Sequence, residues 1–204
     1  MLNNESKSIA SSAILIGIAS LVSRIVGLFR DKTFAHLFGN GLITDAYYAA
    51  FKVPDLIYNL LIVGALTAGF IPIFTKLFYQ GENKSKAWQL ANNVINIIGV
   101  TLTAAATLGI IFMPYLARVI APGFPPAGHD LLIVYARIMF LSPLVLGISM
   151  VLGGILQSLR QFFLYSLAPI FYNLGIIFGA LVLYPVFGLS GIGAGVILGA
   201  LMHA

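Results

Sequence analysis

The sequence predicts an all-α integral membrane protein, a bundle of six transmembrane helices. Hydrophobic residues make up 60% of the 204 residues and charged residues only 8%, and the mean hydropathy is +1.01. Soluble domains carry about 25% charged residues, so most of this chain must face lipid. In lipid only helices and closed barrels satisfy every backbone hydrogen bond, and apolar runs of about twenty residues favour helices.

The first helix is expected over residues 8–38. It begins after the polar sequence MLNNESK and contains an apolar run from Ile9 to Phe29. That run is too long for the core of a signal peptide and no small-residue cleavage site follows it, so we expect an uncleaved helix. Gly39 and Gly41 end it.

The second helix is expected over residues 45–79, after Thr44, which suits an N-cap. Pro54 and Pro72 lie inside this range. Because proline removes a backbone hydrogen bond, we expect kinks at both positions.

Four further helices follow, divided by polar or proline-containing links. They are expected over residues 87–120, 130–159, 162–184 and 189–204. The last contains Gly191, Gly195 and Gly199 at four-residue spacing, which favours close packing of two helices. This segment is still apolar at Ala204, so we expect one domain over residues 1–204 that is a piece of a longer, two-lobed protein.

Basic residues in the links predict that the amino terminus is cytoplasmic. With that orientation the inner side holds Lys7, Lys76, Lys84, Lys86 and Arg160, and the outer links hold no lysine or arginine. This agrees with the excess of positive charge on the cytoplasmic side of membrane proteins.

Charged residues inside the first two helices predict a polar cavity. An arginine or aspartate at bilayer depth costs about 2.5–3.5 kcal/mol and normally faces a bundle interior. At about 100° per residue the charges of each helix fall on one face. We therefore expect the two faces to meet across a cleft, with these candidate binding residues: Arg24, Arg30, Asp31, Asp45 and Lys52.

Four of these five residues, all except Asp45, also have a purely structural interpretation. Arg24 and Asp31 are seven residues apart and can form an internal ion pair, and Lys52 can pair with Asp55 across one turn. Arg30 can extend its guanidinium to the membrane interface. The third helix carries a further polar face, which we expect to pack against another helix: Gln89, Asn92, Asn93, Asn96, Thr103 and Thr107.

Several functional classes lack support in the sequence. There is no cysteine, and His36, His129 and His203 are far apart, so we expect no metal site. The sequence contains no catalytic or nucleotide-binding motif, so we expect neither an enzyme nor a bound cofactor. The sequence also lacks the dense cluster of basic residues that would indicate nucleic-acid binding.

Short motifs along the whole chain resemble the MurJ/MviN family of lipid II flippases. They are SRIVGLFRD at residues 23–31, TDA at 44–46, FKVP at 51–54, GA at 64–65, FIP at 70–72, APGF at 121–124, GILQ at 154–157, AP at 168–169 and Asn173. The resemblance implies an exporter-type fold of fourteen helices, with two six-helix lobes around a central cavity, of which this chain would be the amino-terminal lobe.

The resemblance also implies a function, which is flipping of lipid II, a lipid-linked peptidoglycan precursor, across the bacterial inner membrane. Arg24, Arg30 and Asp45 match the family's cavity charges, and Asp31 and Lys52 match charged positions of the same motif. The implied partners are an undecaprenyl-diphosphate sugar, the bilayer and the second lobe, with no cofactor. Arginine suits this substrate because its planar guanidinium matches phosphate oxygens.

The sequence departs from the family pattern after the FKVP motif. Tyr58 replaces an arginine, Asn59 stands where a second arginine is usual, Val63 replaces a glutamate, and Asp55 adds an acid. A related lipid-linked sugar is therefore an alternative substrate. Two further alternatives are a cation-coupled exporter of small molecules that uses Asp45 or Asp55, and a scaffold that binds membrane partners without transport.

Overall fold

The computed structural model describes residues 2–60, 69–81 and 84–204, and the side chains of its first helix from Ile14 onward. Every regular element in this part of the chain is helical, which confirms the all-α class. In chain order the elements are α1 (Leu2–Phe38), α2 (Leu42–Ala50), α3 (Lys52–Tyr58), α4 (Ile71–Gln80), α5 (Ser85–Ile120), α6 (Pro126–Met139), α7 (Ser142–Ser158), α8 (Phe162–Phe178), a π-helical segment (Gly179–Leu183), α9 (Tyr184–Phe187) and α10 (Leu189–His203).

Three helical stretches of the described residues are long and apolar enough to cross a membrane. They are Ser85–Ile120, Pro126–Ser158 and Phe162–Phe187, and α10 is a shorter apolar helix. Lengths of 26 to 36 residues exceed the roughly 20 residues that a bilayer requires. The chain is thus a helical protein with the hydropathy of a membrane protein.

The expected second and fourth helices are divided in the structure. Residues 45–79 contribute to α2, α3 and α4, with residues 61–68, including Val63, outside the described part. Pro54 is the third residue of α3, Pro72 the second of α4, and Pro143 the second of α7. The first turn of a helix has no internal partner for its N–H groups, so proline there costs little.

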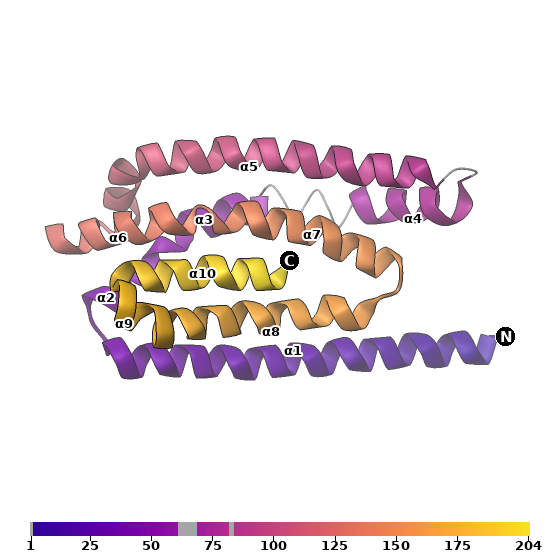
Figure 1. Cartoon of the computed structure of the whole chain (residues 1–204), viewed down its shortest axis with the longest axis horizontal. Helices are drawn as coiled ribbons and strands as arrows, with labels where there is room; N and C mark the ends of the chain where they lie inside the picture. The colour runs from indigo at the N-terminus through magenta and orange to yellow at the C-terminus, as the bar shows by residue number, and fades with distance from the viewer. Residues whose placement is uncertain (1, 61–68, 82–83) are drawn as a thin grey trace.

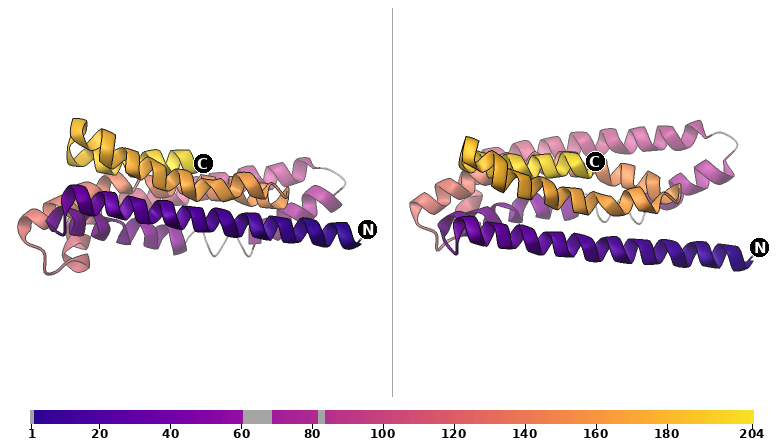
Figure 2. Two further views of the ribbon diagram at one scale, coloured as in Figure 1. Left: turned by 90° about the horizontal axis from the view of Figure 1, so that it is seen from below. Right: turned by 60° about the horizontal axis from the view of Figure 1, so that its bottom comes forward.

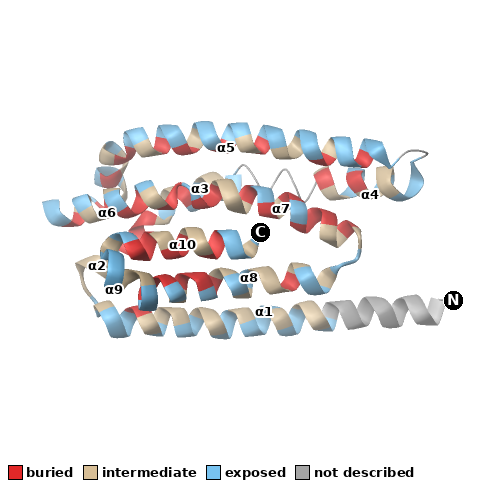
Figure 3. Ribbon diagram, viewed as in Figure 1, coloured by how far each residue is buried: buried red, intermediate tan, exposed pale blue. Residues whose placement is uncertain are grey.

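The long helices run side by side, with α5 along one edge and α1 along the other (Figure 1). Between these edges lie α6 and α7, then α10, then α8, and the two further views show the same long axes (Figure 2). Buried residues concentrate on α6, α7, α10 and part of α8, whereas α1 and α5 turn much of their surface outward (Figure 3). The core therefore lies in the middle rows of the bundle.

Glycines of α10 pack directly against α8 and the π-helical segment, as their spacing predicts. Gly195 faces the backbone of Gly179, and Gly199 faces Gly175 and the backbone of Tyr172. A Cβ added to Gly195 or Gly199 would overlap these backbone atoms. Glycine is required here because two helix backbones approach within contact distance.

Arg137 of α6 has a structural partner in α5. Its Nε donates a hydrogen bond to the carbonyl oxygen of Ile110 at 3.3 Å. Residue 114, four positions after Ile110, is a proline inside α5 and has no N–H to offer that carbonyl. The Arg137 side chain thus satisfies an acceptor that Pro114 leaves without its helical donor.

The polar face of α5 does not pack inside this lobe. All six of its residues are exposed: Gln89, Asn92, Asn93, Asn96, Thr103 and Thr107. Both threonine hydroxyls donate to carbonyls of their own helix, at 2.7 and 2.8 Å. The expected contact with another helix is not made within the described residues.

Candidate functional site

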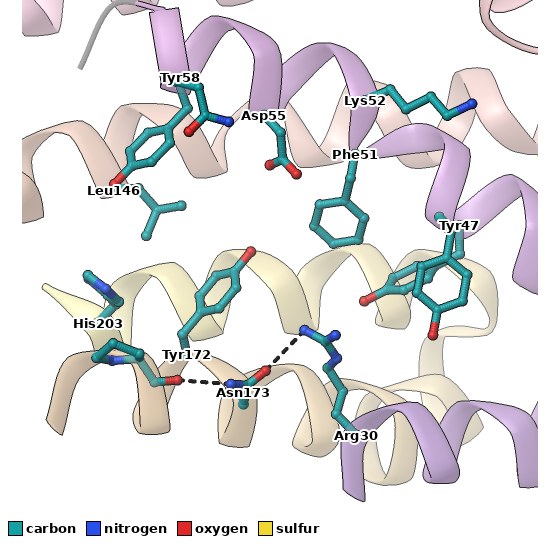
Figure 4. Close-up of a pocket in the computed structure, with 13 residues that line it drawn as sticks. Arg30, Tyr47, Phe51, Lys52, Asp55, Tyr58, Leu146, Tyr172, Asn173 and His203 are labelled. Atoms are coloured by element: carbon teal, nitrogen blue, oxygen red, sulfur yellow. Dashed lines mark hydrogen bonds between the residues drawn. The ribbon is translucent and has the colours of Figure 1, made fainter. Parts of the chain in front are cut away.

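A cavity of about 630 Å³ lies between α2 and α3 on one side and α1, α8 and α10 on the other, and α7 contributes Leu146 to its lining. Figure 4 shows side chains entering it from both sides. Its lining consists of Arg30, Tyr47, Tyr48, Phe51, Lys52, Asp55, Tyr58, Asn59, Leu146, Pro169, Tyr172, Asn173 and His203. Among the described residues the lining is therefore largely aromatic, with three charged side chains.

Arg30 is the most constrained charged residue of the cavity. Its Nε and Nη2 donate to one carboxylate oxygen of Asp31, at 3.0 and 2.8 Å. Its Nη1 donates to Oδ1 of Asn173 at 3.0 Å. Three bonds to two partners fix the plane of the guanidinium, and the side chain remains 25% exposed. A fixed, partly exposed guanidinium is suited to binding an anion.

Asn173 holds Arg30 from α8. It is a buried residue, and its Nδ2 donates to the carbonyl oxygen of Pro169 at 3.1 Å. A longer contact of 3.5 Å reaches the carbonyl oxygen of Ser23 in α1. These bonds set the amide so that Oδ1 points at Arg30 (Figure 4). Asn173 thus ties α8 to α1 at the cavity.

Asp31 extends the same network to α2. The hydroxyl of Tyr48 donates to Oδ1 of Asp31 at 3.3 Å, the oxygen that also accepts from Arg30. Tyr47, the preceding residue, is 1% exposed and stacks on Phe34 of α1 with ring centroids 4.3 Å apart. The Arg30 network is therefore anchored on three helices, α1, α2 and α8.

The structure brings three of the five predicted site residues to this place. Arg30 and Lys52 line the cavity, and Asp31 binds Arg30. Arg24 and Asp45 are exposed and do not line it. Of the two charged faces expected to meet across a cleft, each thus contributes only part of its charges to the cavity.

The ion pairs considered from sequence alone differ from the one observed. Asp31 pairs with Arg30, its neighbour in the chain, and not with Arg24. Within the described residues Arg24 and Lys52 form no ion pair, so the Lys52–Asp55 pair is not observed. Arg30 points into the cavity, where Asn173 holds it (Figure 4).

Among the aromatic residues of the cavity, Tyr47, Phe51 and Tyr172 were not predicted from the sequence. Tyr48, Phe51, Asp55 and Tyr58 are spaced by three, four and three residues, which places them on one helical face. This spacing could have identified Phe51 as part of the cavity wall. Tyr172 and Asn173 carry no such signal, because they reach the cavity from a helix more than a hundred residues away.

No group of three or more metal-binding side chains occurs among the residues that the structure covers. The lone carboxylate of Asp55 and the single imidazole of His203 come from different helices of the cavity wall. The chemistry available is binding of a charged, partly polar group through arginine, carboxylate, amide and tyrosine side chains.

Comparison with known proteins identifies the family. The family described as Lipid II flippase MurJ matches residues 34–204. A probable lipid II flippase MurJ of Buchnera aphidicola subsp. Schizaphis graminum is 35% identical over 172 residues, covering 83% of this chain and 33% of that protein. The corresponding protein of Rhizobium tropici is 34% identical, covering 82% and 32%.

A third relative covers the whole chain. A probable lipid II flippase MurJ of Bdellovibrio bacteriovorus is 32% identical over 208 residues, which is 100% of this chain and 40% of that protein. The chain thus spans about a third of the length of the curated relatives it matches. On the match over residues 34–204, the chain belongs to the lipid II flippase MurJ family.

Proposed function

We propose that this chain is the amino-terminal lobe of a flippase that moves lipid II across the bacterial inner membrane. The cavity would bind the diphosphate headgroup while the polyprenyl tail stays in the bilayer. One observation carries the proposal: Arg30 is held at the wall of a cavity of about 630 Å³ with its guanidinium partly exposed. Membership of the MurJ family supports the choice of substrate.

The hydrogen bonds of Arg30 leave it able to bind a ligand. A guanidinium has five N–H donors, and the structure uses one on each nitrogen, for Asp31 and Asn173. Two donors remain for phosphate oxygens. Between substrates Asp31 neutralises the cation, which otherwise would be an unpaired charge in a low dielectric.

The proposed topology has six spans with the amino terminus in the cytoplasm. In Figure 1 the start of α1, the adjoining ends of α4 and α5, and the α7–α8 turn lie at one end of the bundle. Four basic residues belong to that end, Lys76, Lys84, Lys86 and Arg160, whereas Arg118 stands in the last turn of α5 at the other. This distribution favours the first end as cytoplasmic.

Directional transport follows from the charge of the substrate. A membrane potential that is negative inside drives an anion outward with about 2.3 kcal/mol per charge per 100 mV. We propose that a second lobe, outside this chain, completes the cavity, and that rocking of the lobes exposes Arg30 to each side in turn. No nucleotide site is needed, so the protein acts as a transporter and not as an enzyme.

The test uses the full-length protein in cells depleted of their own flippase. Arg30→Ala should abolish appearance of the lipid-linked precursor on the outer face, because it removes the cation that binds the diphosphate. Arg118→Ala, an exposed arginine outside the cavity, is the matched control and should export normally. Both variants should insert in equal amounts. Normal export by Arg30→Ala would overturn the proposal.

A further inference from the structure

The cavity wall opposite Arg30 carries an acidic side chain without a partner. Asp55 of α3 lines the cavity, and its carboxylate points into the space that Tyr172 and Arg30 enter from the other side (Figure 4). Within the described residues this carboxylate accepts no hydrogen bond and forms no ion pair. It therefore retains its full capacity to bind a donor.

Neither cation of the cavity neutralises Asp55. Arg30 pairs with Asp31 and donates its remaining protein bond to Asn173. Lys52 lies three residues before Asp55, but its ammonium points away from it (Figure 4) and is in no ion pair. A carboxylate in a membrane cavity is costly when unpaired, which favours a cationic ligand.

Aromatic rings next to Asp55 favour an ammonium group over an inorganic cation as its ligand. Tyr58 of α3 and Tyr172 of α8 enter the same part of the cavity (Figure 4). Ring faces attract ammonium groups, and a carboxylate adds a charge-assisted hydrogen bond. Inorganic cations prefer several oxygen ligands, whereas no group of three metal-binding side chains occurs in the part of the chain described.

We propose that Asp55, with Tyr58 and Tyr172, binds a primary ammonium group of the transported headgroup while Arg30 binds its phosphate. The cavity then selects zwitterionic lipid-linked headgroups, and Asp55 is a specificity-determining residue. This inference rests on the proposed function, because it assigns a second contact to the same substrate. The 630 Å³ volume gives room for both groups at once.

The test reconstitutes the full-length protein in lipid vesicles with two fluorescent probes. One is a polyprenyl-diphosphate-linked headgroup with a free primary amine, and the other is the same molecule with that amine acetylated. The initial rate at which each probe becomes accessible to a quencher is measured. The wild-type protein should move the free amine about tenfold faster, which corresponds to about 1.4 kcal/mol.

Variants of Asp55 separate recognition from folding. Asp55→Asn keeps the shape of the side chain and should move both probes at the slow rate of the acetylated one, whereas Asp55→Glu should keep the preference. Asp130→Asn is the matched control: this exposed acid of α6 does not line the cavity, so the tenfold preference should remain.

Three outcomes would overturn the proposed role of Asp55 without contradicting the proposed flippase function. These are equal wild-type rates for both probes, an equal loss of both rates in Asp55→Asn, or a dependence on Na⁺ that requires Asp55 and ignores the amine. If the folded wild-type protein moves neither probe, the proposed function itself fails.

Discussion

Arg30 Nη1 donates a hydrogen bond to Asn173 Oδ1 at 3.0 Å, joining two residues 143 positions apart in the chain. Arg30 belongs to α1 at the edge of the bundle, and Asn173 to α8 beside it. Because Asn173 is itself held by the carbonyl of Pro169, the bond fixes the guanidinium relative to both helices. The proposed substrate cation is thus oriented before any ligand binds.

Asn173→Ala should lower transport about tenfold without preventing insertion. The change removes one hydrogen bond to a charged group, a bond of about 1.5–3 kcal/mol, while the pair of Arg30 with Asp31 remains. Transport rate against substrate concentration is the measurement, and weaker apparent binding is expected. Ser166→Ala is the control, because the Ser166 hydroxyl donates only to the carbonyl of Phe163 in its own helix. Equal losses in both variants would contradict a positioning role for Asn173.

Arg24→Ala should reduce export less than Arg30→Ala. Arg24 is exposed and has no ion-pair partner in the described structure, and Asp31 is bound to Arg30. For the same reason, adding Asp31→Asn to Arg24→Ala should not restore any lost activity. Export by the single and double variants in flippase-depleted cells checks this. Recovery in the double variant would show that Arg24 neutralises Asp31 after all.

Removing Pro114 should make Arg137 dispensable for stability. Arg137→Ala leaves the carbonyl of Ile110 without a donor, and we expect a loss of about 1 kcal/mol. In Pro114→Ala the backbone N–H of residue 114 returns to that carbonyl, so adding Arg137→Ala should cost much less. Thermal unfolding of the four proteins in detergent gives the coupling energy. Additive losses would show that the Arg137 bond does not compensate for the proline.

Glycine replacements in two helices should have opposite consequences. Gly195→Ala should lower the unfolding temperature markedly, because the new methyl group overlaps the backbone of Gly179. Gly99→Ala in α5 meets no atom within 4 Å, so it should be neutral or stabilise by up to about 1 kcal/mol through helix propensity. Equal melting temperatures for the two variants would contradict the close contact of α10 with the π-helical segment.

Cysteines at Lys86 and Ala127 should label from opposite sides of the membrane. Both positions are exposed, Lys86 in the first turn of α5 and Ala127 in the first turn of α6, and the chain contains no cysteine. With the amino terminus in the cytoplasm, only Ala127→Cys should react with an impermeant maleimide in intact cells. Labelling of both cysteines in intact cells would refute the proposed orientation.

The sequence by itself determined the class of the protein and much of its local structure. Low charge and long apolar runs predict membrane helices because lipid leaves the backbone no other donor or acceptor. The four-residue glycine spacing of α10 predicts its contact with a neighbouring helix, since both depend on one helical face. The motif containing Arg30 and Asp31 resembles the family's motif. It also indicated the arginine that the structure places at the cavity wall.

Only the tertiary structure decided how the charges are used. Arg24 and Arg30 lie on the same predicted face of the first helix, yet only Arg30 donates a hydrogen bond to Asn173. That contact depends on how α8 packs against α1. Pro54 predicts the division of the second helix at Phe51, but only the packing of α3 places Asp55 at the cavity. Helical periodicity fixes which side chains share a face, but the partner of that face is set by contacts between residues far apart in the chain.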